Sequence, residues 1–211
     1  MVLRLFAFSL AIIGAVSPAF AHHVMGGALP SSVLGGFLSG LGHPLIGLDH
    51  AAFLLGAGIA AAFLPSALTA ILGFVAATVA GCLLHVYGVT LPLAEIVVAA
   101  SVVLLGVLVL SGRRVTGLSY GALFIVAGLF HGFAYGESIL GAAQPPLAAY
   151  LIGFATIQLV VALAVTGLVR VIWNAATPDT ISTRLTGALV AGIGAAFLFE
   201  QLETLLLGVA A

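Results

Sequence analysis

LAEIVVAASVVLLGVLVLSGRR, residues 93–114, shows in one stretch what kind of fold this chain adopts. An apolar run from Leu93 to Ser111 is followed at once by Arg113 and Arg114. A helix that crosses a bilayer needs about 20 mainly apolar residues. Every backbone amide inside lipid must be hydrogen-bonded, which a helix achieves by itself. Barrel strands would alternate polar and apolar residues, and this run does not. The stretch therefore predicts a transmembrane α-helix that ends at a pair of arginines.

The whole chain has the composition of this stretch. Hydrophobic residues make up 63% of its 211 residues and charged residues 5%, whereas a soluble domain is about a quarter charged. Such a chain cannot cover a water-facing surface, so its solvent is lipid. The absence of lysine excludes a P-loop lysine or a Schiff base. A single cysteine, Cys82, excludes an intrachain disulfide, and a lone cysteine is usually a small apolar side chain. Five scattered arginines make no basic patch, so we expect no nucleic-acid partner.

The first residues, Met1 to Ala21, predict a cleavable signal peptide. One arginine precedes a short apolar core, and Ala19-Phe20-Ala21 has the small-residue pattern of a cleavage site. We expect cleavage after Ala21 and a mature chain that starts at His22. The alternative is an uncleaved first transmembrane helix, which N-terminal sequencing would distinguish.

Six further apolar runs predict an all-α bundle of six transmembrane helices after the signal. The runs are Gly47 to Leu64, Ala67 to Val89, Leu93 to Ser111, Leu118 to Tyr135, Leu147 to Trp173 and Leu185 to Val209. The expected organisation is a signal peptide (1–21), a periplasmic N-terminal segment (22–46) and a transmembrane domain (47–211). Within the second segment, Val33 to Leu41 is read as an interfacial or re-entrant piece. Small residues, such as Gly36 with Gly40 and Gly192 with Gly194, favour close helix packing.

The arginines predict the orientation. Signal cleavage places the mature N-terminus outside, and counting through six helices places Arg113, Arg114, Arg170 and Arg184 on the inner side. The positive-inside rule requires the same distribution. The predicted location is the bacterial inner membrane, crossed several times, with a periplasmic N-terminus.

Side chains that bind metal gather on the opposite, outer side of this topology. An ionisable group at the bilayer centre costs about 2.5–3.5 kcal/mol, so such groups usually face a cavity and have a function. Imidazole and carboxylate together are ligands of nickel, cobalt and zinc. The candidates are His43, Asp49, His50, Glu95, His131 and Glu137, with His85, Glu200, Glu203, His22 and His23 as weaker ones.

The motif HPLIGLDH, residues 43–50, is the most informative of these. His43 and His50 are seven residues apart, so they share a face if the stretch is one helix. Pro44 and Gly47 favour a break instead, and a broken helix offers free carbonyls at a transport site. Asp49 either binds the ion or holds a histidine tautomer from outside the ligand shell.

A second cluster is FHGFAYGE, residues 130–137. On a continuous helix His131 and Glu137 do not share a face, because six residues turn through about 240°. We expect Gly132 and Gly136 to unwind the helix and bring both side chains inward.

Several candidates have an ordinary structural reading as well. Asp49 and Glu95 suit the first turn of a helix, where carboxylates are favoured. His85 fits a hydrogen bond to a carbonyl group as well as it fits a ligand. Glu200 and Glu203 either line the route of the ion or lie at the outer surface, and these alternatives stay open.

At these residues the chain resembles the HupE/UreJ family of bacterial metal permeases. The resemblance rests on the motif at 43–50, on Pro92-Leu93-Ala94-Glu95 with Ala100-Ser101-Val102, and on Phe130-His131-Gly132 through Glu137. It covers nearly the whole chain, and the first and third motifs together are fairly specific. The family implies secondary uptake of nickel, or of cobalt in some members, for enzymes such as hydrogenase and urease. Tyr135 departs from the pattern, because we expect many members to have another histidine there.

The resemblance implies a metal site made of His43, Asp49, His50, Glu95, His131 and Glu137. We therefore expect a permease, not an enzyme, that has no cofactor and moves nickel or cobalt as its substrate. Its expected partners are the ion and the lipid bilayer, while self-association and delivery to a cytoplasmic metallochaperone stay open. The alternatives are a metalloenzyme, an assembly factor that binds metal without transporting it, and an efflux channel.

Overall fold

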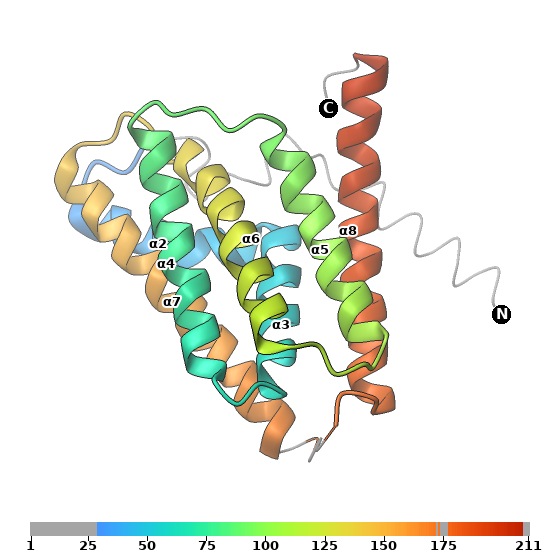
Figure 1. Cartoon of the computed structure of the whole chain (residues 1–211). Coiled ribbons are helices and arrows are strands. Elements are labelled where there is room, and N and C mark those ends of the chain that lie inside the picture. Colours follow the sequence, from blue (N-terminus) through green and yellow to red (C-terminus); the bar gives the residue numbers. More distant parts are fainter. Residues whose placement is uncertain (1–28, 172, 174–176, 209–211) are drawn as a thin grey trace, which may run out of the picture.

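The computed structural model describes residues 29–171, 173 and 177–208, and every regular element in them is a helix (Figure 1). These helices are α2 (Val33–Ile46), α3 (Leu48–Ala62), α4 (Ala67–Val86), α5 (Ala94–Leu110), α6 (Gly117–Glu137), α7 (Gln144–Val171) and α8 (Ile181–Leu207). The expected all-α fold is confirmed over this part of the chain. The predicted signal peptide, with His22 and His23 after it, lies outside the described residues.

The helices have the lengths and composition of membrane spans. α4, α6, α7 and α8 are each long and apolar enough to cross a membrane. α2 and α3 satisfy the same criterion together but are bent by 78°, as in a broken span or a re-entrant loop. α5 is apolar but has 17 residues. The chain is thus a multi-pass helical membrane protein with four to five candidate spans in its described part, and the count of six stays a prediction.

Helix α3 is the centre of the bundle, since it contacts each of the other six helices of the described chain. Most of its residues from Asp49 to Ala62 are buried. Its many alanines and glycines let the neighbours approach closely: a Cβ on Gly58 would lie 2.8 Å from the carbonyl oxygen of Ala162 on α7. A residue near the start of α3 is therefore held deep inside the molecule.

The surrounding helices are held together by glycines. α4 packs along α6, α5 along α8 and α2 along α7. A Cβ on Gly132 would overlap the carbonyl oxygen of Thr78, and one on Gly40 would overlap that of Tyr150. Small residues at membrane helix interfaces allow this approach of one backbone to another. The packing predicted for Gly40 and Gly194 is confirmed, since a Cβ on Gly194 would lie 2.6 Å from the backbone nitrogen of Val103, whereas a Cβ on Gly192 would face open space.

One end of the bundle is rich in arginine. α3, α5 and α7 end there and α4, α6 and α8 begin there, at the lower side of Figure 1. Arg170 Nε donates to the carbonyl oxygen of Ala62 at 2.8 Å, and Arg184 Nε donates to that of Leu110 at 3.1 Å. Because the last carbonyl groups of a helix have no partner within it, these two arginines satisfy the ends of α3 and α5.

Candidate metal-binding site

Three histidines and an aspartate from three helices meet inside the bundle. His43 lies in the last turn of α2, Asp49 and His50 lie in the first turn of α3, and His131 lies within α6. Their exposed fractions are 4%, 3%, 2% and 0% in that order. Four of the six residues predicted to bind metal thus form one buried cluster, which we call the histidine cluster. It lies within the helix bundle and not at its rim.

The break between α2 and α3 shapes this cluster. Gly47 ends one helix and starts the other, and the two helix axes differ by 78°. A Cβ on Gly47 would lie 2.7 Å from His50 Cδ2 and 3.3 Å from Asp49 Oδ1, so a larger residue would displace these side chains. The break predicted in the motif is confirmed at Gly47, while Pro44 stays within α2. The bend leaves the rings of His43 and His50 with centroids 6.0 Å apart.

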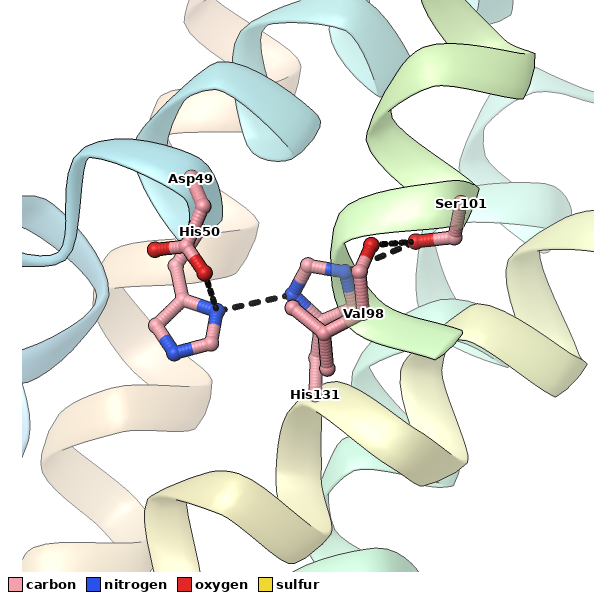
Figure 2. Close-up of polar contacts among 5 residues, drawn as sticks. All are labelled: Asp49, His50, Val98, Ser101 and His131. Atoms are coloured by element: carbon pink, nitrogen blue, oxygen red, sulfur yellow. Dashed lines mark hydrogen bonds and ion pairs between the residues drawn. The ribbon is translucent and has the colours of Figure 1, made fainter. Parts of the chain in front are cut away.

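His50 Nδ1 is the central atom of the cluster (Figure 2). It lies 2.9 Å from His131 Nδ1 and 3.9 Å from Asp49 Oδ2. Two nitrogens that share a tetrahedral ion at about 2.0–2.1 Å are about 3.3 Å apart, so a small separation of the rings would admit an ion between them. In the described part of the chain, no three His, Cys, Asp or Glu side chains are already arranged around one metal position. Metal binding therefore requires these rings to move.

Ser101 on α5 orients the ring of His131 (Figure 2). Its hydroxyl donates to the carbonyl oxygen of Val98 at 2.7 Å and lies 3.0 Å from His131 Nε2. A serine hydroxyl has one hydrogen to donate. Both contacts are satisfied together when the Nε2–H of His131 donates to Ser101. That tautomer leaves a lone pair on His131 Nδ1, facing His50, which then donates its own Nδ1–H.

His43 is held by groups at the end of α6 and on α7. Ser138 Oγ lies 3.1 Å from His43 Nδ1 and 3.1 Å from the hydroxyl of Tyr150, which in turn donates to the carbonyl oxygen of Tyr135 at 2.9 Å. The Tyr135 ring packs edge-on against His43 and His50, with centroid distances of 5.0 and 4.7 Å. The position that departs from the family pattern is therefore part of the wall of the cluster.

The two remaining principal candidates have different surroundings. Glu95 is half-buried in the first turn of α5, six residues before Ser101. Glu137 is exposed as the last residue of α6. The expectation that glycines unwind this helix is wrong, because α6 is continuous from Gly117 to Glu137. Its glycines serve packing instead: a Cβ on Gly136 would lie 2.6 Å from His85 Cβ.

The weaker candidates also lie on described helices. His85 Nδ1 donates to the carbonyl oxygen of Phe133 at 2.9 Å, so the structural reading of this histidine accounts for its position. On α8, Glu200 is half-buried and Glu203 is exposed. Cys82 is completely buried in an apolar cluster, as expected for a small hydrophobic side chain.

The residues that sequence reasoning missed are hydroxyl groups. Ser101, Ser138 and Tyr150 contact the cluster, but none of them was a candidate ligand. The signal available was a single polar side chain within an apolar run, which in a membrane helix usually faces the interior. Which histidine each hydroxyl contacts depends on how the helices pack.

These features define a multi-pass helical membrane protein with a buried histidine–aspartate cluster at its centre. The sequence model of the HupE/UreJ protein family matches residues 10–197, and the chain belongs to this family. A relative, Protein HupE of Rhizobium leguminosarum bv. viciae, is 28% identical over 165 residues, which cover 77% of this chain and 84% of the relative. No solved structure matches the chain. The resemblance seen in the sequence motifs is confirmed.

Proposed function

We propose that this chain is a permease that carries nickel, or a similar divalent transition-metal ion such as cobalt, into the cell across the bacterial inner membrane. The histidine cluster carries the proposal. Imidazole and carboxylate are ligands that these ions prefer, and ionisable groups inside a membrane protein mark substrate pathways. Membership of the HupE/UreJ family, which is associated with nickel uptake, supports the same function.

In this proposal the ion binds between His50 and His131. It replaces the hydrogen bond between their Nδ1 atoms, and the proton on His50 Nδ1 is released as the ion binds. His43 and Asp49 supply further ligands or orient the rings. The lone pair that Ser101 leaves on His131 Nδ1 faces the ion. Glu95 and Glu137, nearer the outer end, would attract the ion before it enters.

Aromatic rings close the cluster toward the arginine-rich end. The centroid of the Phe53 ring lies 4.6 Å from that of His131 and 5.3 Å from that of Phe74. The ring of Phe124 packs against both phenylalanines. An ion held by the histidines must displace these rings to go further inward. The proposal therefore includes two states, one open to the outside and one open to the cytoplasm, with the arginine-rich end on the cytoplasmic side and six membrane crossings.

Uptake of radioactive nickel into proteoliposomes tests the function. Asp49→Ala and His50→Ala each remove a member of the cluster, so we expect uptake to fall to the level of empty liposomes. His85→Gln is the matched control, because it removes a histidine outside the cluster, and we expect it to transport as the wild type does. Cobalt, zinc and manganese in the same assay would establish the preferred ion.

The outcome also separates the alternatives. Wild-type uptake by both cluster variants would exclude the proposed site. Nickel binding by the wild-type protein without any uptake would instead favour an assembly factor that holds metal, and product formation would favour a metalloenzyme. Rescue of a metal-starved strain, as opposed to protection of a metal-poisoned one, distinguishes uptake from efflux.

A further inference from the structure

A cavity of about 390 Å³ opens at the arginine-rich end, where α3 ends and α6 begins. Arg113 and Arg114 line it from one side, and Leu64, Val115 and Tyr120 contribute to its walls. The histidine cluster is lined by none of these residues. The cavity is therefore a separate feature, and we call it the arginine cavity.

The two arginines of this cavity differ from the other two at this end. Arg170 and Arg184 donate to carbonyl groups at helix ends. By contrast, Arg113 and Arg114 are exposed, and their guanidinium groups donate no hydrogen bond to the residues that the structure describes. Within the described residues, the five N–H groups of each guanidinium are not used for hydrogen bonds.

The charge at this end is positive. Asp179 is the one acidic residue at this end within the described ranges, against four arginines. Its carboxylate accepts from the Thr177 hydroxyl, which lowers the pKa of Asp179, and Arg114 and Arg184 lower it further. Since a single carboxylate cannot neutralise four guanidinium groups, an anion is the ligand that this end attracts.

A second cavity, of about 480 Å³, continues from the first. The two share Leu64, Pro65 and Gly117, and the second extends between α4 and α6 past Gly121 and Ile125. A Cβ on Gly117 or Gly121 would meet nothing within 4 Å, so these glycines leave the groove open. Both helices are candidate membrane spans, so the groove leads from the arginine cavity into the hydrocarbon region.

We propose that an anionic phospholipid of the membrane binds here, with its phosphate in the arginine cavity and an acyl chain in the groove between α4 and α6. The planar guanidinium group binds phosphate through two hydrogen bonds, and basic pockets between transmembrane helices hold anionic headgroups. A zwitterionic headgroup has no net charge, so the pair of arginines attracts it less strongly than an anionic headgroup. A free phosphate ion would leave the apolar groove unfilled.

Lipid retention by the purified full-length chain tests this site. The protein, in mild detergent, is offered equal amounts of phosphatidylglycerol and phosphatidylcholine, and bound lipid is counted by native mass spectrometry. We expect the wild type to retain phosphatidylglycerol. The double variant Arg113→Gln/Arg114→Gln should weaken this binding about thirtyfold, since each arginine near an anionic lipid contributes roughly a fivefold gain in affinity. The double variant Arg113→Lys/Arg114→Lys keeps the positive charge, so it should bind phosphatidylglycerol nearly as tightly as the wild type does.

The groove has its own matched pair of variants. Gly121→Leu fills open space in the groove, whereas Gly192→Leu fills open space on α8, away from it. A Cβ at either position meets nothing within 4 Å, so both variants should fold and bind nickel as the wild type does. We expect Gly121→Leu to lose phosphatidylglycerol and Gly192→Leu to retain it.

Three results would overturn the proposal: equal retention of both lipids by the wild type, full retention by Gly121→Leu, or displacement of phosphatidylglycerol by an equal concentration of inorganic phosphate. The last would assign the cavity to a soluble anion.

Discussion

Hydroxyl groups contact one ring nitrogen of His131 and one of His43, and so influence which nitrogen of each ring is available to an ion. A metal binds to the lone pair of a neutral imidazole, and the hydrogen bond at the other nitrogen determines where that lone pair lies. Ser101 takes the Nε2–H of His131 and leaves Nδ1 facing His50. Ser138 stands in a comparable position at Nδ1 of His43. The cluster is thus prepared by residues that would not themselves bind the ion.

The contribution of Ser101 can be measured. Ser101→Ala removes the acceptor of the His131 Nε2–H, and we expect the Kd for nickel to rise about tenfold to a hundredfold, as when a partner that orients a metal-binding histidine is lost. Isothermal titration of the purified protein gives this value. In ¹⁵N NMR spectra, His131 should be a single Nε2–H tautomer in the wild type and a mixture in the variant.

Ser101→Thr is the conservative control. Its hydroxyl can still bond to a carbonyl group of the preceding helical turn, so the tautomer and the affinity should stay close to those of the wild type. A single tautomer with unchanged nickel affinity in Ser101→Ala would show that Ser101 does not orient His131.

At the scale of elements, the interruption of one helix creates the site. A continuous helix through residues 33–62 would separate His43 from His50 by two turns, or about 10 Å along the axis. The bend at Gly47 turns α3 into the centre of the bundle and leaves the two rings 6.0 Å apart. α6 shows the opposite behaviour, since Gly128, Gly132 and Gly136 pack against α4 and do not break the helix.

Gly47 is therefore a position where a single methyl group should disturb the histidine cluster directly. Its φ of −67° and ψ of 110° suit alanine, so Gly47→Ala acts through contact and not through backbone strain. The new Cβ, 2.7 Å from His50 Cδ2, should turn that ring away from His131. We expect a loss of stability of about 1–3 kcal/mol and at least about tenfold weaker nickel binding, measured by thermal unfolding and titration.

Gly167→Ala on α7 is the matched control for this experiment, because a Cβ there meets nothing within 4 Å. This variant should leave the thermal stability and the nickel affinity unchanged. If Gly47→Ala behaved in the same way, the close contact between Gly47 and His50 would not be a feature of the protein in its membrane.

At the scale of the whole molecule, the two ends of the bundle carry different chemistry. Arginines gather at one end of the bundle. At the opposite end α4 and α6 finish and α5 begins (Figure 1), so His85, Glu95 and Glu137, which belong to those helix ends, lie toward that side. Under the positive-inside rule we expect the arginine-rich end to be cytoplasmic. In the proposed direction of uptake an ion would meet the carboxylates first, then the imidazoles, and the arginine-rich end last.

A cysteine labelling experiment tests this orientation. The natural Cys82 is 0% exposed, so it should not react in the intact protein. Ser111→Cys places a thiol in the loop after α5, and Thr90→Cys places one in the loop after α4, both at exposed positions. The experiment uses cells whose outer membrane has been removed and whose inner membrane is intact. In these cells a membrane-impermeant maleimide should label the Thr90→Cys variant and not the Ser111→Cys variant. Labelling of the Ser111→Cys variant and not of Thr90→Cys would show that the protein has the opposite orientation in the membrane.

The sequence by itself determined that this protein lies in a lipid membrane, that its fold is helical, which family it belongs to and which residue types lie at its centre. These follow from hydropathy, charge and short motifs, which are local properties of the chain. Only the tertiary structure decided that His43, Asp49, His50 and His131 meet while Glu137 stays exposed, and that the Ser101 hydroxyl faces Nε2 of His131. Those contacts join different helices, so they depend on the rotation and packing of each helix against α3, which no local pattern specifies.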